Sequence, residues 1–553
     1  MIYKSKIGRE DIQYGNGTFS RMGRTGFDIT LTEVIDPSIE HNSNGTHSKL
    51  TQVTDPWVDA RAYGAVGNGT TDDTAALQAA LNVVPINGIL DLANKTYKVS
   101  AGLTLANGAT IRNGKITWSV TSAIDIFTVK DNTIFDNVRF NGSGAIGTVG
   151  VPLYQRAIFG GTNPAIPAIN VTIKNCRFEN MTVGIWSGGA STDSVPTGWK
   201  IFDNHFENIV GYKGNSEGYA VILTPSSKGL VSGNTFKTIT RHAIYLAGGA
   251  SNNHVENNII ETVDNIGIQI NTGSTQPDSK NNLISNNIVR NITKSIAYGY
   301  RSSVGIGVYG KSPDNTISHN LIDDYLDTGI DISSVTSAAI YGVGNRVSGN
   351  TIMNGGVASD ACIRLDDPDN YEVSNNRCIP PNNTYGVITS GSYTPSKISY
   401  FGKNTIIALG SGAVGIRLAL PSAGHMIDTN HITVCTTPIY DTGSGNYYKE
   451  ANKDTIGTAV ISDGSNTLYA GKNSSTQIRE SALTADVNLT LSNSGAGDGS
   501  SFRVIRAASA TGAFNLNVKN HDASTLKVLS AAGTWVELTF NAVNWVTTAA
   551  GSL

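Results

Sequence analysis

The feature that most constrains this chain is an asparagine that returns, followed closely by an apolar residue, at a nearly regular interval through its middle. It recurs 24 to 33 residues apart, at Asn175, Asn204, Asn234, Asn258, Asn287, Asn320, Asn350, Asn376, Asn404 and Asn430. Each interval also holds a second short apolar segment, often led by glycine, as in HAIYLAG and TGIDISS. Such a period predicts a parallel β-solenoid with one coil per repeat. We expect the asparagines to be structural, with inward amides bonding between coils.

Composition limits what such a solenoid can bind. Charged residues make up 15% of the 553, and 40 basic residues stand against 43 acidic ones, a net charge of −3. This balance leaves no broad basic face, so we expect no nucleic-acid partner. The spacing of cysteine and histidine does not suit zinc, and we expect neither a metal nor a cofactor.

The chain also lacks the patterns of membrane and secreted proteins. No apolar run reaches the ~18 residues that cross a bilayer, so we expect no membrane insertion. The opening MIYKSKIGREDIQYG has no apolar signal core. We therefore expect synthesis in a cytoplasm without a signal peptide.

Four segments differ in composition along the chain. Residues 1–55 are polar and rich in turn signals, and they predict a small N-terminal module. Residues 56–440 carry the repeats, and 441–475 are rich in Gly, Ser and Asn, which is typical of a connector. Residues 476–553 hold separate strands that we expect to be antiparallel. The predicted fold class is all-β: a right-handed parallel β-helix, or single-stranded solenoid, with a C-terminal β-sandwich-like domain.

One helix is expected near 74–82, at the start of the repeats. Asp72, Asp73 or Thr74 can cap it, and Leu77 and Leu81 fall on one side. A solenoid exposes unpaired strand edges at its end, and a covering helix prevents other strands from pairing there. We therefore interpret this helix as the cap of the first coil.

Three stretches of the chain resemble known proteins. DARAYGAVGNGTTDDTAALQAALN is similar to the opening segment of pectin-lyase-like right-handed β-helices, which include phage tailspikes. KIGREDIQYGNGTFSR resembles the segment that docks phage tail proteins on the virion, and TWVELTFNAVNWVTTAAGSL resembles a tailspike C-terminal β-domain.

This resemblance implies a polysaccharide depolymerase in the tail of a virion. It implies a homotrimer that docks on a phage tail or baseplate protein through residues 1–55. It also implies action outside the cell, at the host surface, on capsule or O-antigen. Residues 476–553 would then serve trimerisation or carbohydrate binding.

The second apolar segment of each coil places one polar or aromatic residue outward. In the frame Gly-Ile-X-Ile the two Ile point inward and X points outward, and coils stack at about 4.8 Å. Aromatic faces and polar groups in line suit a sugar chain. The aligned X residues are Trp186, Tyr245, Gln269, Gly307, Asp331, Arg364 and Arg417. The predicted substrate-binding residues are Trp186, His242, Tyr245, Gln269, Asp331 and Arg364.

Acidic residues just before this frame are the predicted catalytic groups. Asp264 and Asp327 are two coils apart, as are Glu217 and Asp264, which gives about 9.5 Å and suits an inverting glycosidase. Asp327 and Asp360 fall in neighbouring coils at about 5 Å, which suits a retaining one. LDTGID also resembles active-site turns of polygalacturonase-like hydrolases. The choice among these pairs stays open.

Two other functions stay open on the same fold. A polysaccharide lyase would take its base from Arg241, His242 or Tyr245. A receptor-binding fibre would bind without cleaving. If none of the four predicted acids is catalytic, the groups near Asp366 and Asp367 at a subunit boundary are the next candidates.

Overall fold

The computed structural model divides the chain into two compact units, Met1–Thr54 and Asp55–Leu553. It describes the strands β1 (Asp11–Gln13) and β2 (Phe19–Arg21), which pair antiparallel, and most of 57–553. The residues it leaves undescribed after 57 are 121, 162–167, 189–194, 216, 274, 295–298, 300–301, 334, 337–338, 341–342, 357–358, 391–397, 410, 420–424, 436, 442–445, 449–457, 462–463, 471–472, 474–475, 495 and 497–499. The predicted docking segment therefore lies almost wholly outside the described residues.

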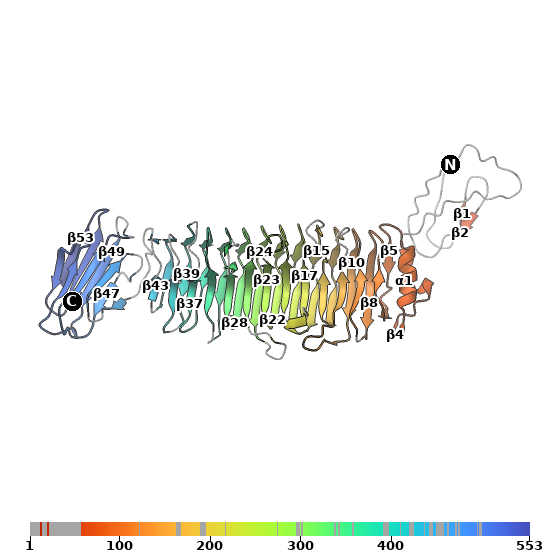
Figure 1. Ribbon diagram of the computed structural model, residues 1–553, viewed down its shortest axis with the longest axis horizontal. Helices are drawn as coiled ribbons and strands as arrows, with labels where there is room; N and C mark the ends of the chain where they lie inside the picture. Colours follow the sequence, from red (N-terminus) through yellow and green to blue (C-terminus); the bar gives the residue numbers. More distant parts are fainter. Residues whose placement is uncertain are drawn as a thin grey trace, which may run out of the picture. The chain divides into compact units, whose positions relative to one another are not determined.

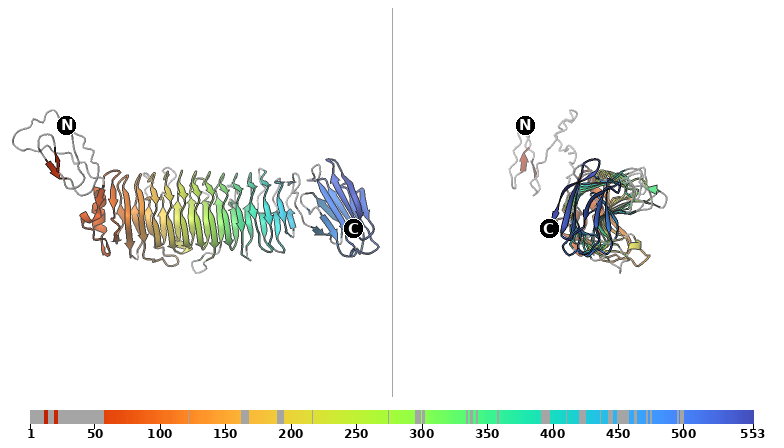
Figure 2. Two further views of the ribbon diagram at one scale, coloured as in Figure 1. Left: turned by 180° about the vertical axis from the view of Figure 1, so that it is seen from behind. Right: turned by 90° about the vertical axis from the view of Figure 1, so that its left-hand side faces the viewer.

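From β3 onward the chain winds as a parallel β-helix, which confirms the predicted fold class (Figure 1). A regular coil contributes two short strands to one long stack and a third to a separate 13-stranded sheet. Strands of successive coils lie side by side along the solenoid in both lengthwise views (Figure 2). Pairing is parallel in register, so that Ile260 lies beside Val289 and Ile268 beside Ile306.

The strands of the long stack are β3 (Trp57–Asp59), β4 (Asn68–Asp72), β5 (Ile89–Asp91), β6 (Thr96–Val99), β8 (Thr110–Trp118), β10 (Ile134–Asn141), β12 (Thr172–Lys174), β13 (Arg177–Met181), β15 (Lys200–Phe202), β16 (His205–Ile209), β18 (Leu230–Ser232), β19 (Thr235–Ile239), β21 (His254–Glu256), β22 (Ile259–Val263), β24 (Leu283–Ser285), β25 (Ile288–Ile292), β27 (Thr316–Ser318), β28 (Leu321–Tyr325), β32 (Arg346–Ser348), β33 (Thr351–Met353), β35 (Glu372–Ser374), β36 (Arg377–Cys378), β38 (Tyr400–Gly402), β39 (Thr405–Ile407), β41 (Met426–Asp428), β42 (His431–Thr433) and β44 (Tyr447–Tyr448). The strands of the 13-stranded sheet are β7 (Leu103–Thr104), β9 (Ile124–Thr128), β11 (Gln155–Phe159), β14 (Val183–Trp186), β17 (Tyr219–Leu223), β20 (His242–Ala247), β23 (Ile266–Thr272), β26 (Val304–Gly310), β29 (Thr328–Ser333), β34 (Ala361–Asp366), β37 (Tyr385–Ser390), β40 (Val414–Leu418) and β43 (Thr437–Asp441).

The interior of the solenoid is a continuous column of apolar side chains. Inward positions of most strands are buried, and most of them are Ile, Val, Leu or Phe. Phenylalanines of consecutive coils stack face to face, with ring centroids 4.8, 4.7 and 4.8 Å apart, at Phe140, Phe178, Phe206 and Phe236. The core therefore repeats coil by coil, and stability is a sum of neighbouring contacts.

The recurrent asparagines form the predicted ladder inside the coils. Each main-chain N–H and side-chain Nδ2 donates to Oδ1 of the asparagine one coil on; for Asn258 and Asn287 these distances are 3.0 and 2.9 Å. The ladder runs unbroken from Asn204 to Asn430. A second ladder, which the sequence interpretation missed, joins Asn253, Asn282, Asn315 and Asn345.

The prediction that Asn175 begins the ladder was wrong, because the inward position in this coil belongs to the next residue. Asn175 has φ 55° and lies outside the ladder, bonding Asp136. Cys176 takes the inward place, and its N–H donates to Asn204 Oδ1 at 2.9 Å. Asparagine tolerates the left-handed conformation of this turn, which cysteine does not favour.

Helix α1 runs from Thr74 to Val83 and buries Leu77, Ala80 and Leu81 against the first coils. Its N-cap residue, Asp73, does not cap it through its side chain. That carboxylate instead accepts the N–H groups of Val66 and Gly67. A short 3-10 helix, η1 (Ala60–Tyr63), precedes it, and another, η2 (Lys213–Asn215), lies in a later loop.

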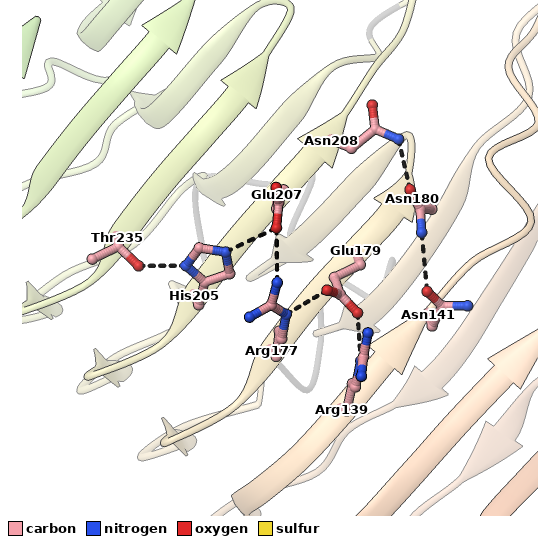
Figure 3. A network of polar contacts seen from close by, with 9 residues as sticks. All are labelled: Arg139, Asn141, Arg177, Glu179, Asn180, His205, Glu207, Asn208 and Thr235. Carbon is pink, nitrogen blue, oxygen red and sulfur yellow. Dashed lines mark hydrogen bonds and ion pairs between the residues drawn. The ribbon is translucent and has the colours of Figure 1, made fainter.

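The outer face of the long stack carries ion pairs that bridge coils (Figure 3). Glu179 accepts from Arg139 and Arg177, and Arg177 reaches Glu207 at 2.8 Å. The charges of this network are mutually satisfied. We therefore interpret this network as a stabilising part of the surface rather than a binding site.

The C-terminal part folds as two facing sheets around one core that includes Leu489, Val504 and Trp545. The five-stranded sheet holds β45 (Thr458–Val460), β47 (Thr476–Arg479), β49 (Ser501–Arg506), β52 (Thr534–Phe540) and β53 (Trp545–Ser552). The four-stranded sheet holds β46 (Asn466–Tyr469), β48 (Val487–Ser492), β50 (Leu516–Lys519) and β51 (Thr525–Leu529).

The expectation of antiparallel strands throughout this part was wrong. Pairs β45–β47, β47–β49, β46–β48 and β48–β50 are parallel, and only the last strands pair antiparallel. Successive strands alternate between the two sheets, so neighbours in one sheet run in the same direction. Strands β44 to β46 also fall within 441–475, where a connector was expected. Within the described residues, no helix is long and apolar enough to span a bilayer.

Candidate active site

The outward positions of the 13-stranded sheet line up as the sequence predicts. Pairing registers join Trp186, Tyr245, Gln269, Gly307, Asp331, Arg364 and Arg417 in one line, and add Phe159, Ile222, Ile388 and Tyr440. We call this line the outward column. Inward neighbours such as Ile244 and Ile268 are fully buried, which confirms the alternation.

One end of the outward column is aromatic. The ring of Trp186 packs edge-on against Phe159, and the Arg156 guanidinium lies 4.9 Å and 3.8 Å from the two ring centroids. Tyr245 stacks on Tyr219 with centroids 5.5 Å apart and an interplanar angle of 8°. Tyr219, with Trp186 and Tyr245 packed against it, belongs to an apolar cluster outside the solenoid core. They give the column a flat face of the kind on which sugars stack.

His242, also predicted to bind substrate, lies beside the outward column. It pairs with Tyr219 and Ile266 in the line beside the column, and its side chain is only 4% exposed. Its ring tilts against Tyr219 and Tyr245 at 5.3 and 5.2 Å. The histidine therefore supports the tyrosines rather than facing the surface.

The middle of the outward column is charged, with three carboxylates around one guanidinium. Arg364 donates to Asp366 and to Asp360, each at 3.3 Å. Asp331 lies directly beside Arg364 in the register and accepts the Tyr309 hydroxyl through Oδ2 at 3.0 Å. We call Asp331, Asp360 and Asp366 the carboxylate cluster.

Asp331 differs from its two neighbours in its surroundings. Its Oδ1 atom is buried, and no described protein group bonds to it. Burial raises the pKa of Asp331 to about 6, an effect that Arg364 opposes and the negative charge of Asp366 strengthens. The Tyr309 hydroxyl lowers the same pKa, and Asp360 raises it. A carboxyl with this pKa is partly protonated near neutral pH and can donate a proton.

Asp264 and Asp327 occupy the predicted turns, two coils apart along the sheet. Both are partly buried and engaged, whereas exposure was expected. Asp264 accepts the Thr293 hydroxyl at 2.6 Å. Asp327 pairs with Lys294 and accepts the Ser303 N–H at 2.7 Å. Each carboxylate thus has a structural partner in a neighbouring coil.

Asp360 lies one coil beyond Asp327, as predicted, and its N–H donates to the Asp327 carbonyl at 2.7 Å. Glu217, by contrast, is fully buried. Its Oε1 accepts from Leu153 N–H and its Oε2 from Tyr212 N–H, so both oxygens hold loops of the chain. Burial raises the pKa of Glu217. Glu217, predicted as a catalytic candidate, is therefore covered by a loop distant in sequence.

Sequence reasoning missed Tyr309 and gave Asp366 only a secondary place. Each lies two residues beyond an outward-column residue, Gly307 and Arg364, and so points to the same face. That spacing was available as a signal. Within the described part of the chain, no three His, Cys, Asp or Glu side chains form a group that could hold a metal ion.

Two known families match parts of the chain. The family described as "Right handed beta helix region" matches residues 93–339. The family described as "N terminal extension of bacteriophage endosialidase" matches residues 65–118, which covers α1 and the first coils and not the predicted docking module.

Among solved structures, a variant of the tailspike protein of E. coli bacteriophage HK620, in complex with a pentasaccharide, matches at a TM-score of 0.54. The match has 12% identity and covers 92% of this chain and 94% of that one. The Dettilon tailspike matches at 0.43, with 15% identity and coverage of 70% and 68%. The A-module of an Azotobacter vinelandii mannuronan C-5 epimerase also matches at 0.43, with 15% identity and coverage of 70% and 99%.

These findings confirm the fold that the sequence indicated. The chain has the fold of a phage tailspike with a right-handed β-helix.

Proposed function

We propose that this chain is a tailspike depolymerase that hydrolyses glycosidic bonds in a bacterial surface polysaccharide, capsule or O-antigen, with Asp331 as general acid. The observation that carries the proposal is the state of Asp331. Its carboxyl is buried in the outward column, its pKa is about 6, and no described protein group bonds to Oδ1. A general acid needs a pKa near the working pH.

The outward column also suits a sugar chain as ligand. Four of its side chains hold a buried polar atom that no described group of the protein bonds: Trp186 Nε1, Gln269 Oε1, Asp331 Oδ1 and Arg417 Nε. A buried polar atom costs free energy unless it is hydrogen-bonded. A polyhydroxylated chain lying along the column supplies donors and acceptors at each coil. Trp186 and Tyr245 supply stacking faces at one end.

In the proposed reaction, Asp331 Oδ1 gives its proton to the glycosidic oxygen as the bond from that oxygen to the anomeric carbon breaks. The carboxylate of Asp366, held by Arg364, takes a proton from water while the water oxygen bonds to the same carbon. Asp366 lies one coil on and two residues along from the Asp331 row, so their Cα atoms are about 8 Å apart. An inverting glycosidase holds its two carboxyl groups roughly 6.5–9.5 Å apart, and this spacing of the two Cα atoms is compatible with that.

The matched test is a series of Asp→Asn variants. Asp331→Asn and Asp366→Asn should lower turnover by about 10²–10⁴, the range for loss of a general acid or base. Asp264→Asn and Asp327→Asn test the rival pair that the sequence suggested. Asp323→Asn, on the outer face of the long stack, is the control for a carboxylate far from the column. Wild-type cleavage by Asp331→Asn would refute the assignment.

The same digestions separate hydrolysis from the alternatives. Capsular and O-antigen polysaccharides are incubated with the protein, and fragments are analysed by mass spectrometry. New reducing ends without unsaturation support hydrolysis. Ultraviolet-absorbing unsaturated ends indicate a lyase, and binding without shortening indicates a receptor-binding fibre. The anomer first formed, observed by NMR, tests inversion.

We also infer that the protein is a homotrimer in the virion tail and acts outside the cell. The tailspike fold supports this, and the resemblance of residues 1–55 to a segment that docks phage tail proteins supports attachment to a tail or baseplate protein. Sedimentation of the intact protein should give three chains. Protein that starts at Trp57 should keep full depolymerising activity, and loss of activity in a folded form would give residues 1–55 another role.

A further inference from the structure

Gly307 is the one position among the described members of the outward column that has no side chain. It lies between Gln269 and Asp331 in the register. A Cβ atom at Gly307 would lie 2.5 Å from Cε2 and 2.8 Å from the hydroxyl oxygen of Tyr309. The gap in the column is therefore filled by the ring of Tyr309, which folds back over it.

This placement explains how Tyr309 reaches Asp331. Tyr309 stands two residues beyond Gly307 on β26, and its register partner on the next coil is Ser333, not Asp331. Gly307 is the residue that pairs with Asp331. Only by crossing the Gly307 position does the phenol arrive beside that carboxyl, where it donates to Oδ2 at 3.0 Å.

We propose that Gly307 and Tyr309 form a positioning pair for Asp331: the glycine makes room for the ring, and the phenol holds Oδ2, which leaves Oδ1 as the oxygen that carries the proton. This inference rests on the proposed role of Asp331 as acid. Tyr309 acts through Asp331 and does not itself exchange a proton with the sugar.

The chemistry of the pair favours proton donation. When Asp331 Oδ1 gives its proton to the glycosidic oxygen, negative charge develops on the carboxyl. The bond from the Tyr309 hydroxyl to Oδ2 then becomes charge-assisted and stronger. Burial raises the pKa of Tyr309 well above its ordinary value, and the charge of Asp331 raises it further. The phenol therefore keeps its proton and remains a donor throughout.

The other groups that face Asp331 are the charges of the next coil. Arg364 favours the ionised carboxylate, whereas Asp366 and Asp360 oppose it. Tyr309→Phe leaves these three in place and removes one donor to Oδ2. The pKa of Asp331 should therefore rise, because a hydrogen bond to the charged form has been lost.

The test compares Tyr309→Phe with Tyr400→Phe, a matched control on the other face of the solenoid. Tyr400 also donates its hydroxyl to an aspartate, Asp428, at 3.2 Å. For Tyr309→Phe we expect kcat to fall about 10- to 100-fold, the range for a hydrogen bond to a charged group, with KM nearly unchanged. The basic limb of the pH–rate profile should move to higher pH. Tyr400→Phe should change neither.

Gly307→Ala tests the second member of the pair. The added methyl must displace the Tyr309 ring, so this variant should reproduce the kinetic changes of Tyr309→Phe. The double variant should be no worse than the poorer single one, because both remove the same bond. If a melting experiment shows that Gly307→Ala does not fold, the kinetics of Tyr309→Phe alone test the positioning pair.

The outcomes separate this inference from the proposed function. If Asp331→Asn is inactive and Tyr309→Phe has the wild-type kcat and pH profile, the positioning pair is refuted and the acid stands. If Asp331→Asn cleaves normally, the acid is refuted. The positioning pair is then tested by a measurement that does not depend on cleavage. The pKa of Asp331 is read from an infrared pH titration of its carboxyl band, which is identified by its absence from Asp331→Asn. An unchanged titration in Tyr309→Phe would refute it.

Discussion

Asn287 gives the sharpest test of how the solenoid is held together. It lies in the middle of the inward ladder and is 1% exposed. The Oδ1 atom of Asn287 accepts two hydrogen bonds from Asn258, one from the main-chain N–H at 3.0 Å and one from the side-chain Nδ2 at 2.9 Å. Its own Nδ2 donates to the carbonyl of Val255 and to Asn320 Oδ1, both at 2.9 Å. One side chain thus bonds three consecutive coils.

The substitution Asn287→Ala removes all of these bonds at once. The Asn258 N–H and the Val255 carbonyl are then left buried without their side-chain partner. An orphaned buried donor or acceptor costs about 1–3 kcal/mol. Two of them give about 4 kcal/mol, before any contribution from the cavity. We therefore expect Asn287→Ala to be among the most destabilising single changes in the solenoid.

Cys176→Ala is the control, because Cys176 occupies the same inward column but offers no amide. Its N–H still donates to Asn204 after the change. We expect a cost of about 1 kcal/mol for the small side chain that is lost. Unfolding rates in guanidinium, together with hydrogen exchange of the peptide 254–262, measure both effects. Equal unfolding rates and equal exchange in the two variants would refute the role assigned to the ladder.

Four further predictions concern charge and assembly. Turnover should fall as pH rises above about 6, because burial raises the pKa of Asp331 to about 6 and the acid must be protonated. Burial opposes ionisation of Glu179, but bonds from Arg139 and Arg177 outweigh it and lower its pKa. Its stabilising effect, about 1 kcal/mol, is therefore present above the unfolded-state pKa and lost as pH falls through the lower folded-state pKa; melting of Glu179→Gln between pH 3 and 6 checks this. Arg506→Lys should cost about 3 kcal/mol in calorimetry, because the buried guanidinium donates to five carbonyls. Deleting residues 476–553 should reduce the fraction of the proposed trimer, measured by sedimentation, more strongly than it reduces the rate of cleavage.

The solenoid could be predicted because its signal is local and repeated. Inward Ile and Val alternate within each strand, and the asparagines mark each coil. The same repetition produced the error at Asn175, where two neighbouring positions both accept a polar residue. The first position, Asn175, adopts a positive φ, and the second, Cys176, faces inward. The sequence alone does not show which of the two positions takes which role. The C-terminal strands show the same alternation of apolar and polar residues whether they pair parallel or antiparallel. Their parallel pairing depends on which of the two sheets each strand joins.

The outward column could be predicted in the same way, but its chemistry could not. The sequence places Asp331 and Arg364 side by side and is silent on which carboxyl is buried. Glu217 follows a turn and has the pattern of an exposed acid, yet the Leu153 loop covers it. Burial of this kind depends on contacts between segments more than sixty residues apart.

The carboxylate cluster also explains why a rigid solenoid is a suitable support for an acid. The groups that set the state of Asp331 come from three consecutive coils: Tyr309 from β26, Asp331 itself from β29, and Arg364 with Asp366 from β34. The ladder steps from Asn287 to Asn320 and from Asn320 to Asn350, with the buried Ile330, hold these coils in register. A slip of one residue would turn every outward side chain inward. The inward ladder therefore fixes the register on which the outward chemistry depends, and stability and function occupy opposite faces of the same strands.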